Sequence, residues 1–411
     1  MSAAPQPIGA RDSGRESLEA RLLRRLLSGL GNPPIDFLFK WTGERIATAS
    51  ATPVATVQIA DRGTLLGLLT DPQMRFGDAY SSGRIEVIGD LIGLMNVVYR
   101  GSPAQDEDGS IGQRVAGWLH RPRRNTLTGS RDNIQRHYDL GNDFYSLWLG
   151  ETMAYTCAYF PHADAALDEA QIAKMDHVCR KLRLTAGASV VEAGCGWGGL
   201  ALHMAQRYGA KVRAFNISRQ QIAFARRRAR DLGLENRVEF IEDDYRNIRG
   251  SYDVFVSIGM LEHVGTENYE ELGRVVRRSI GSTGRGLIHS IGRNRPAPLH
   301  PWIERRIFPG AYPPSISQMM QIFEPSDLSV LDVENIRLHY ALTLRHWLRR
   351  YEGAVDKVRA MFDERLVRTW RLYLAGSVAA FETGVLQLFQ ILFTGQENND
   401  IPLTREHLYG R

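Results

Sequence analysis

A glycine-rich stretch is the part of the sequence whose residue types point most directly to chemistry. Residues 192–199 read EAGCGWGG, and Gly194, Gly196 and Gly199 match the pattern GxGxxG. Glycines at this spacing let backbone amides approach a ligand closely at the N-terminus of a helix. Dinucleotide-binding proteins share the pattern, so the neighbouring residues must decide which ligand it serves.

Three neighbouring features favour S-adenosylmethionine over a nicotinamide dinucleotide. An acid, Glu192, stands two residues before the first glycine. The second predicted strand ends in Asn216, whereas a nicotinamide ribose prefers an acid there, and the third strand leads into the acidic turn 242–245. This layout suits a cationic, adenosine-bearing ligand without a pyrophosphate. We therefore predict that S-adenosylmethionine lies over the glycines, with its ribose near Asn216 and its adenine near the acidic turn.

A second set of polar residues stands at the edge of the same predicted sheet, where such folds place their chemistry. Glu262 and His263 follow the fourth strand, and His289 ends the next one. Tyr340 and Cys157 lie elsewhere in the sequence. Singly, each has an ordinary structural explanation, as a core tyrosine, a small buried thiol or a capped histidine. Together with the glycine loop they form a recognisable set.

The elements that must position these residues alternate between strand and helix from about residue 170. Helices separate the predicted strands, which span 188–193, 211–216, 237–241, 253–258 and 286–291. A proline-rich insertion at 296–314 follows, and an insertion at this place normally covers the ligand crevice. Long helices are predicted from 341 to about 394. The pattern predicts an α/β fold, a Rossmann-like doubly wound parallel sheet with a helical cover.

The first hundred residues predict a small α+β domain. Residues 15–30 place leucines on one helix face and arginines on the other, so this helix either lies on an anionic bilayer or packs on its own domain. Strand-like runs are predicted within 45–69, the last of them at 64–69, followed by a short helix over 72–83, a strand over 84–88 and a helix over 90–100. The predicted domains are a disordered tail 1–14, an N-terminal lipid-docking or dimerisation domain 15–103, a linker 104–128 and a catalytic domain 129–411.

Composition restricts the class of protein. The 411 residues are 43% apolar and 24% charged, as in ordinary globular proteins. No stretch of 18 apolar residues occurs, and the N-terminus lacks a basic start followed by an apolar run, so neither a membrane span nor a secretory signal is expected. The three cysteines have no metal-ligand or disulfide spacing, so we expect no metal site and a reducing cytoplasm.

Arginine dominates the basic residues. Five of the 51 are lysines, which leaves 46 arginines. Guanidinium groups suit phosphate oxygens, so this excess fits phospholipid head groups or nucleic acid, and it is also what a GC-rich genome encodes.

Several segments resemble the cyclopropane-fatty-acid-phospholipid synthase family, which includes the mycolic acid cyclopropane synthases. They cover most of 130–411 in the expected order, and FGDAYSSGRIEV (76–87) resembles the N-terminal part of the phospholipid-acting members. The segments are HYDLGNDFYSLWL (137–149), MAYTCAYF (153–160), EAQIAKMDHVCRKL (169–182), VVEAGCGWGG (190–199), NISRQQ (216–221), SIGMLEHVG (257–265), LIHSIG (287–292) and HYALTLRHW (339–347).

The resemblance implies the class I methyltransferase form of the predicted α/β fold, and it implies a role for each residue of the sheet edge. A methyl group would pass from S-adenosylmethionine to the double bond of an acyl chain, and a bound bicarbonate ion would then remove a proton to close the ring. Glu262 would accept the bicarbonate hydroxyl proton, while His289, Tyr340 and backbone amides near Cys157 and Ile291 would donate to its oxygens. The implied catalytic residues are Glu262, His289, Tyr340 and Cys157. The predicted cofactor contacts are Tyr155, Thr156, Glu192, Gly194, Gly196, Gly198, Asn216, Gln221, Asp244 and Tyr245.

The resemblance further implies a binding site walled by aromatic rings and partners at a membrane. Rings that could stabilise a carbocation and exclude water are Tyr155, Phe160, Trp197 and Tyr340. The expected partner is a phospholipid bilayer with unsaturated acyl chains, met at the inner membrane surface by a peripheral cytoplasmic enzyme. We expect a homodimer and no nucleic acid.

Two departures from the family pattern keep other functions open. Asn216 stands where threonine is frequent, and Leu261 stands where phenylalanine is usual, which could change the fate of the carbocation. The alternatives are a lipid C-methyltransferase that makes methyl- or methylene-branched acyl groups, a small-amine N-methyltransferase and a catalytically silent lipid-binding protein.

Overall fold

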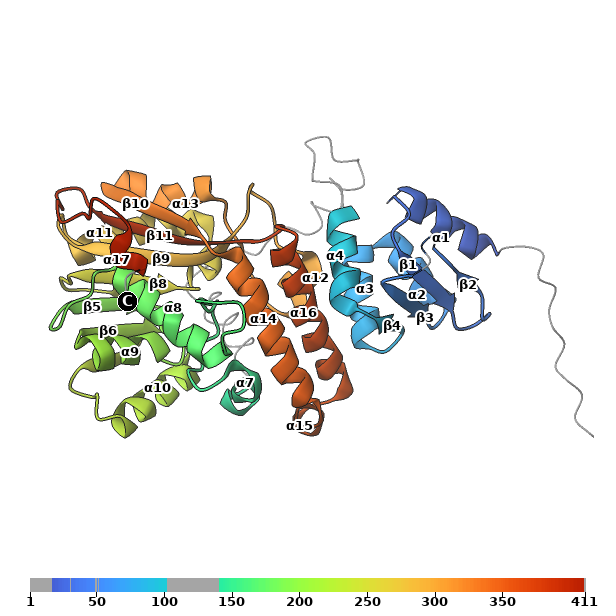
Figure 1. The fold of residues 1–411 in the computed structure, drawn as a ribbon, viewed down its shortest axis with the longest axis horizontal. Coiled ribbons are helices and arrows are strands. Elements are labelled where there is room, and N and C mark those ends of the chain that lie inside the picture. Colours follow the sequence, from blue (N-terminus) through green and yellow to red (C-terminus); the bar gives the residue numbers. More distant parts are fainter. Residues whose placement is uncertain (1–16, 30, 49, 51, 102–139, 410–411) are drawn as a thin grey trace, which may run out of the picture.

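The computed structural model describes residues 17–29, 31–48, 50, 52–101 and 140–409, which form two units side by side (Figure 1). The larger unit is a sheet with helices on both faces, and the smaller one is built from the described residues up to 101. The predicted tail 1–14 and linker 104–128 lie outside the described residues. In the part of the chain that the structure describes, no helix has the length and apolar character needed to cross a bilayer.

Seven strands form the sheet of the larger unit, in the order β10-β11-β9-β8-β5-β6-β7. β11 runs antiparallel to both of its neighbours, and the other pairs are parallel. The five predicted strands are all present, so the prediction of a largely parallel α/β sheet is confirmed. The strands are β5 (Ser189–Ala193), β6 (Lys211–Asn216), β7 (Val238–Glu242), β8 (Val254–Ile258), β9 (Arg285–Gly292), β10 (Leu328–Asn335) and β11 (Gln387–Gly395).

Each face of this sheet has its own apolar core. One core joins the sheet to α8 (Leu167–Lys181), α9 (Gly199–Tyr208) and α10 (Arg219–Asp231). The other joins it to α11 (Tyr269–Ile280) and α13 (Ile316–Phe323). β5 pairs with β6 on one side and β8 on the other, so the strand order reverses at β5, and the crevice for a ligand lies at its carboxyl end.

A helical cover stands between the sheet and the smaller unit (Figure 1). Its helices are α7 (Asn142–Leu149), α12 (Pro301–Arg306), α14 (Arg337–Gly353), α15 (Val355–Met361) and α16 (Glu364–Glu382). The prediction of helices up to residue 394 is wrong in its last part. Gly384 turns the backbone with a φ of 79°, and the following residues pair with β9 and β10 as strand β11. β10 was likewise not predicted.

The smaller unit carries a four-stranded sheet in the order β2-β1-β3-β4 with helices packed on it, which confirms an α+β unit. The predicted strand at 64–69 is wrong, because Asp61 caps a helix there by accepting the N–H of Thr64 (2.9 Å). The strand at 35–39 was missed. The elements are α1 (Leu18–Gly29), β1 (Ile35–Phe39), β2 (Arg45–Ile46), β3 (Ala55–Ile59), α2 (Arg62–Thr70), α3 (Pro72–Ser81), β4 (Ile85–Gly89) and α4 (Leu91–Gly101).

Polar contacts join the smaller unit to the helical cover. Arg368 on α16 donates to the carbonyl oxygens of Tyr80 and Ile85, and its guanidinium lies 4.5 Å from the centre of the Tyr80 ring. Asp78 on α3 accepts two hydrogen bonds from Arg306 on α12 (2.9 and 2.8 Å). Charge-assisted bidentate pairs of this kind fix orientation as well as contact, so the two units form a defined seam.

Candidate active site

The glycine loop 194–198 fills the turn between β5 and α9. Gly194, Gly196 and Gly198 have φ angles of 81°, 54° and 81°, in the left-handed region that favours glycine. Cβ atoms at Gly194 and Gly198 would crowd neighbouring side chains, whereas a Cβ at Gly196 would meet no described atom within 4 Å. The backbone around Gly196 is therefore open to a ligand at the N-terminus of α9, as the cofactor prediction requires.

The end of β6 lies directly beside this loop. The side-chain amide of Asn216 donates to the carbonyl of Gly196 (3.3 Å) and to Oε1 of Gln221 (2.7 Å). The carbonyl of Asn216 accepts the N–H of Asp243 (3.1 Å), which brings in the acidic turn. The structure thus gathers the residues predicted to surround the ribose and the adenine.

Within the acidic turn, Asp244 and Tyr245 already have a neighbour in Arg246. The Asp244 carboxylate pairs with the Arg246 guanidinium (3.1 Å) and caps the short 3-10 helix η1 (Tyr245–Asn247). That guanidinium also lies 4.9 Å from the centre of the Tyr245 ring. Contacts of these two side chains with adenine stay a prediction.

Glu192 lies beneath the glycine loop, with only 2% of its surface exposed. Burial raises the pKa of Glu192 to about 8, opposed by the charge of Lys174 and a backbone hydrogen bond from Ala201. Lys174 on α8 is equally buried, and burial lowers its pKa to about 8. Both groups lie inside the protein, and the hydrogen bond from Ala201 joins Glu192 to the first turn of α9, next to the glycine loop. Direct contact of Glu192 with the cofactor stays a prediction.

The segment 153–160 connects α7 to α8 and passes the carboxyl end of β8. Thr156 accepts a hydrogen bond from Nζ of Lys174 (3.0 Å) on its hydroxyl and one from Gln171 (2.9 Å) on its carbonyl. The Thr156 methyl group lies 3.0 Å from the Cβ position of Gly259, the residue after β8. Two predicted cofactor residues, Tyr155 and Thr156, are thereby held near the sheet edge.

Cys157 and Tyr340 are brought together by one residue of the helical cover. The Ala158 N–H, next to Cys157, donates to Oγ1 of Thr343 (3.0 Å), and Thr343 lies one helical turn from Tyr340 on α14. Burial raises the pKa of the Cys157 thiol, so the thiol stays protonated and is a poor nucleophile. This fits a packing or backbone-positioning role.

Glu262 follows β8 in the short 3-10 helix η2 (Leu261–His263) and is buried. Its Oε1 accepts the backbone N–H of Ile291 (2.6 Å), so the amide predicted to serve bicarbonate binds Glu262 here. Its carbonyl accepts the N–H of Tyr312 (2.8 Å), which confirms that the proline-rich insertion covers this edge. Burial raises the pKa of Glu262 to about 7, opposed by main-chain N–H groups and the nearby Ser290 hydroxyl. The Ser290 hydroxyl donates to the carbonyl of Ile291 (2.9 Å), and Oε2 of Glu262 has no hydrogen-bond partner among the described residues.

His289 lies inside β9 rather than at its end, because pairing with β11 extends β9 to Gly292. It sits opposite Ile258, the last residue of β8. Its Nδ1 lies 3.1 Å from Nε2 of Gln390 on β11, and its own Nε2 is buried without a partner among the described residues. Burial, helped by the charge of Lys174, lowers the pKa of His289 to about 3, so the imidazole is neutral.

Aromatic rings line the neighbourhood of Tyr155. Its ring centre lies 5.2 Å from that of Trp148 and 5.5 Å from that of Trp347, and Tyr340 in turn lies 5.9 Å from Trp347. Trp197, in the glycine loop, joins the same cluster through Tyr145 (5.1 Å). Phe160, the fourth predicted ring, stacks instead on His346 at 5.5 Å.

Two buried atoms test whether a bicarbonate ion fits this edge. Glu262 Oε2 follows β8 and His289 Nε2 lies on the neighbouring strand β9, and each is unpaired within the described residues. Buried polar groups normally have partners. A small oxyanion with one hydroxyl group supplies both a donor and an acceptor, so the residues fit it. The described part of the protein holds no cluster of three or more His, Cys, Asp or Glu that could bind a metal ion.

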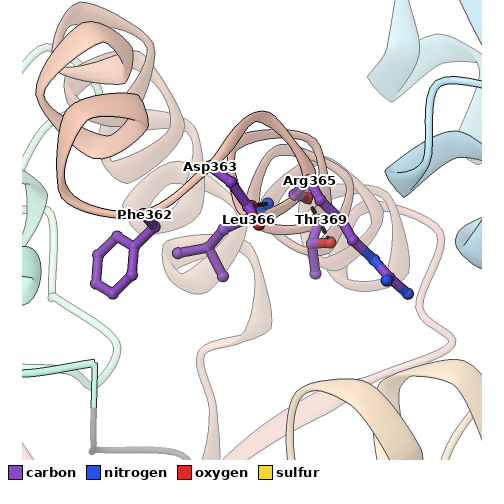
Figure 2. Close-up of a pocket in the computed structure, with 5 residues that line it drawn as sticks. All are labelled: Phe362, Asp363, Arg365, Leu366 and Thr369. Atoms are coloured by element: carbon purple, nitrogen blue, oxygen red, sulfur yellow. Dashed lines mark hydrogen bonds between the residues drawn. The ribbon is translucent and has the colours of Figure 1, made fainter.

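A surface hollow of about 270 Å³ lies elsewhere, at the start of α16 (Figure 2). Its lining includes Asp363, which caps α16 by accepting the N–H of Leu366 (2.7 Å). Arg365 points away from Phe362 in this view. None of the predicted site residues lines the hollow, so it is separate from the sheet edge.

Three buried residues at the site were missed by sequence reasoning: Gln171, Lys174 and Gln390. The first two share one face of α8, three residues apart, which is a signal for a buried stripe. Gln390 was missed because the segment that contains it was wrongly predicted to be a helix. The signal for its strand was an apolar run bounded by Gly384 and Gly395.

With this geometry established, comparison with known proteins identifies the family. A family model described as mycolic acid cyclopropane synthetase matches residues 125–391. The chain belongs to this family. A probable fatty acid methyltransferase of Pseudomonas putida is 37% identical over 383 residues, or 90% of this chain and 95% of the relative. The cyclopropane-fatty-acyl-phospholipid synthase of Escherichia coli K12 is 37% identical over 272 residues, or 66% of this chain and 70% of that enzyme.

A solved structure of a family member supports the cofactor. The mycolic acid cyclopropane synthase CmaA1, complexed with SAH and CTAB, aligns with a TM-score of 0.61 and 28% identity over 64% of this chain and 97% of CmaA1. This member of the mycolic acid cyclopropane synthetase family is therefore an S-adenosylmethionine-dependent methyltransferase with the class I fold. The predictions of fold, enzyme class and this cofactor are confirmed.

Proposed function

We propose that the protein methylates the cis double bond of unsaturated phospholipid acyl chains and closes a cyclopropane ring, with bicarbonate as the base. The observation that carries the proposal is the pair of buried, unpaired atoms Glu262 Oε2 and His289 Nε2 at one sheet edge of the described structure. The E. coli relative, named for this product, supports the choice of substrate.

S-adenosylmethionine supplies an electrophilic methyl group when bound, and bicarbonate supplies the base needed for ring closure. A protein carboxylate in direct contact with a sulfonium or a carbocation risks alkylation. Glu262 therefore acts through the bicarbonate ion and does not contact the reacting carbon atoms. It accepts the hydroxyl proton of the anion, and His289 and Tyr340 donate to the remaining oxygens. The aromatic rings around Tyr155 exclude water and present π faces to positive charge.

Mass spectrometry and proton NMR of membrane lipids from cells that express the protein test this proposal. We expect unsaturated phospholipid acyl groups to gain one CH2 unit and to lose their olefinic protons. Retention of olefinic protons after the mass gain would show a methylene or methyl branch. Unchanged lipids would overturn the proposal.

A branched product is the second candidate. The P. putida relative, which aligns over 90% of this chain, is named a probable fatty acid methyltransferase. Leu261, next to Glu262, is fully packed in the core beside α11, where the family usually has a bulkier phenylalanine. Different packing next to the acid could direct the loss of another proton. The same lipid spectra distinguish the two products.

We further propose that the smaller unit docks on the bilayer through α1. Ala20 and Leu23 pack inward, whereas Leu18 and Leu22 are 62% and 47% exposed, and the exposed arginines include Arg21. An apolar stripe flanked by guanidinium groups suits an anionic membrane surface. This would bring the enzyme to the inner membrane face. The homodimer stays a prediction.

A further inference from the structure

Gln390 is a buried amide that contacts the histidine of the site. It is 0% exposed, lies on β11, and is directly paired with His289 across the antiparallel β9–β11 ladder. Directly opposite residues in such a ladder point to the same face. Its Nε2 lies 3.1 Å from Nδ1 of His289.

The orientation of the Gln390 amide decides the roles in this contact. In the orientation of the structure, Nε2 of Gln390 faces the ring and can only donate, so Nδ1 of His289 accepts and carries no proton. Because the imidazole is neutral, its single proton must then lie on Nε2. That is the nitrogen without a partner in the described residues. The opposite orientation would place Oε1 of Gln390, which has no partner among the described residues, against a protonated Nδ1.

The surroundings keep the imidazole in this neutral form. The charged groups whose fields act on His289 are Lys174, His177 and Lys181 on α8 and Glu334 on β10. On the side of Gln390 away from His289, its partner in the β10–β11 ladder is Glu334. The Glu334 carboxylate contacts His177 (2.8 Å) and Lys181 (2.6 Å). The nearby acid is therefore engaged elsewhere, and the lysine charges oppose protonation of the ring.

We propose that Gln390 is a positioning residue that locks His289 in the Nε2–H tautomer, so that the histidine presents a hydrogen-bond donor to the oxyanion. In the other tautomer, Nε2 would present a lone pair and would repel an anion oxygen. The inference rests on the proposed function for the identity of the anion. The tautomer itself does not depend on it.

The tautomer can be measured without lipid or cofactor. Nitrogen-15 NMR of the full-length protein labelled at histidine reports which ring nitrogen is protonated, and a His289→Asn variant assigns the signal. We expect the wild type to carry the proton on Nε2. In Gln390→Glu, an ionised carboxylate can only accept from the ring, so Nδ1 should become protonated. A wild-type proton on Nδ1, or no change in Gln390→Glu, would overturn the proposal.

Kinetics give the second readout. Gln390→Met removes the donor, and we expect the KM for bicarbonate to rise about tenfold, as for one lost hydrogen bond, with the KM for S-adenosylmethionine unchanged. Gln387→Met is the matched control. Gln387 lies on the same strand and is also buried, but it bonds to Gly384 and Asn335, away from His289.

The outcomes separate the two proposals. An unchanged bicarbonate KM in Gln390→Met, or an equal rise in Gln387→Met, would overturn the positioning role. Absence of lipid methylation in the wild type would overturn the proposed function, while an Nε2–H signal that moves in Gln390→Glu would still support the tautomer lock.

Discussion

The carboxylate of Glu262 accepts the backbone N–H of Ile291 at 2.6 Å, which ties the end of β8 to β9. One oxygen of the acid is thereby fixed by the main chain, and the other, unpaired among the described residues, remains for a ligand. The carboxylate is thus oriented before any ligand arrives, and its replacement should affect chemistry more than cofactor binding.

Glu262→Gln should keep the affinity for S-adenosylmethionine and lose most turnover. The amide keeps the shape of the side chain but removes a charged acceptor, at a cost of roughly 2–4 kcal/mol in the barrier. Calorimetric titration and initial rates at saturating cofactor measure the two effects. Glu270→Gln, on the exposed face of α11, is the control and should behave as wild type. Near-normal turnover of Glu262→Gln in bicarbonate-depleted buffer would contradict the assigned role.

Activity should rise as the pH increases through about 7. Burial raises the pKa of Glu262 to about 7, so the acid is protonated below that pH and cannot accept the proton of the anion. His289 stays neutral over this range, because its pKa is lowered to about 3. Rates at constant free bicarbonate and infrared spectra of the carboxyl group measure the same transition. An infrared transition that persists in Glu262→Gln would assign it to another group.

Gly196→Val should abolish cofactor binding. The φ of Gly196 is 54°, and the space beside it is open in the described structure, so a branched side chain would both strain the loop and fill the ligand space. Gly187→Val is a matched control, since Gly187 also has a positive φ (83°) and an open Cβ position but lies in the turn before β5. Titration calorimetry should show binding only in the control. Equal affinities would place the cofactor elsewhere.

Arg21→Gln combined with Arg25→Gln should weaken binding to anionic vesicles by about 2 kcal/mol, roughly 1 kcal/mol for each arginine near the surface. Co-sedimentation with liposomes measures the loss, and the difference should shrink as salt screens the charges. Arg207→Gln with Arg230→Gln removes two exposed arginines from α9 and α10 and serves as the control. Equal binding by the two double variants would assign docking to another surface.

Gly77→Ala should loosen the seam between the two units. Gly77 on α3 packs against the indole of Trp302 on α12, and an added Cβ would overlap that ring. Overpacking of this kind costs about 1–3 kcal/mol. Gly67→Ala on α2 meets only ordinary contacts and should be neutral or stabilising. Limited proteolysis and thermal unfolding should separate the two variants, and equal stability would contradict the packing argument.

The sequence predicted those parts of the site whose residues carry local signals. The glycine loop, Asn216 and the acidic turn follow directly from strand ends and turn residues, and the structure brings them together. The place of Gln390 at the site was not predicted, because an apolar run alone does not distinguish a buried strand from a helix. The partner of Ile291 also escaped, since a backbone amide has no sequence signal and its bond depends on how η2 folds over β9.

The sequence prediction was also wrong where a helix cap outweighed a strand-like residue composition. The apolar run at 64–69 resembles a strand, yet the Asp61 side chain starts a helix there. The burial of Glu192 could not be predicted from the sequence either, because it results from tertiary packing, which also buries Lys174 of α8 near it.

β11 is the last strand in sequence order but lies inside the sheet, between β9 and β10. During synthesis from the N-terminus, β11 is made after β9 and β10. The backbone edges that these two strands present to β11 therefore stay unpaired until it is made. Such edges are the usual starting points of aggregation. The strand that carries Gln390 thus completes both the sheet and the surroundings of His289, and the nascent protein gains a finished site only after this late segment has been inserted.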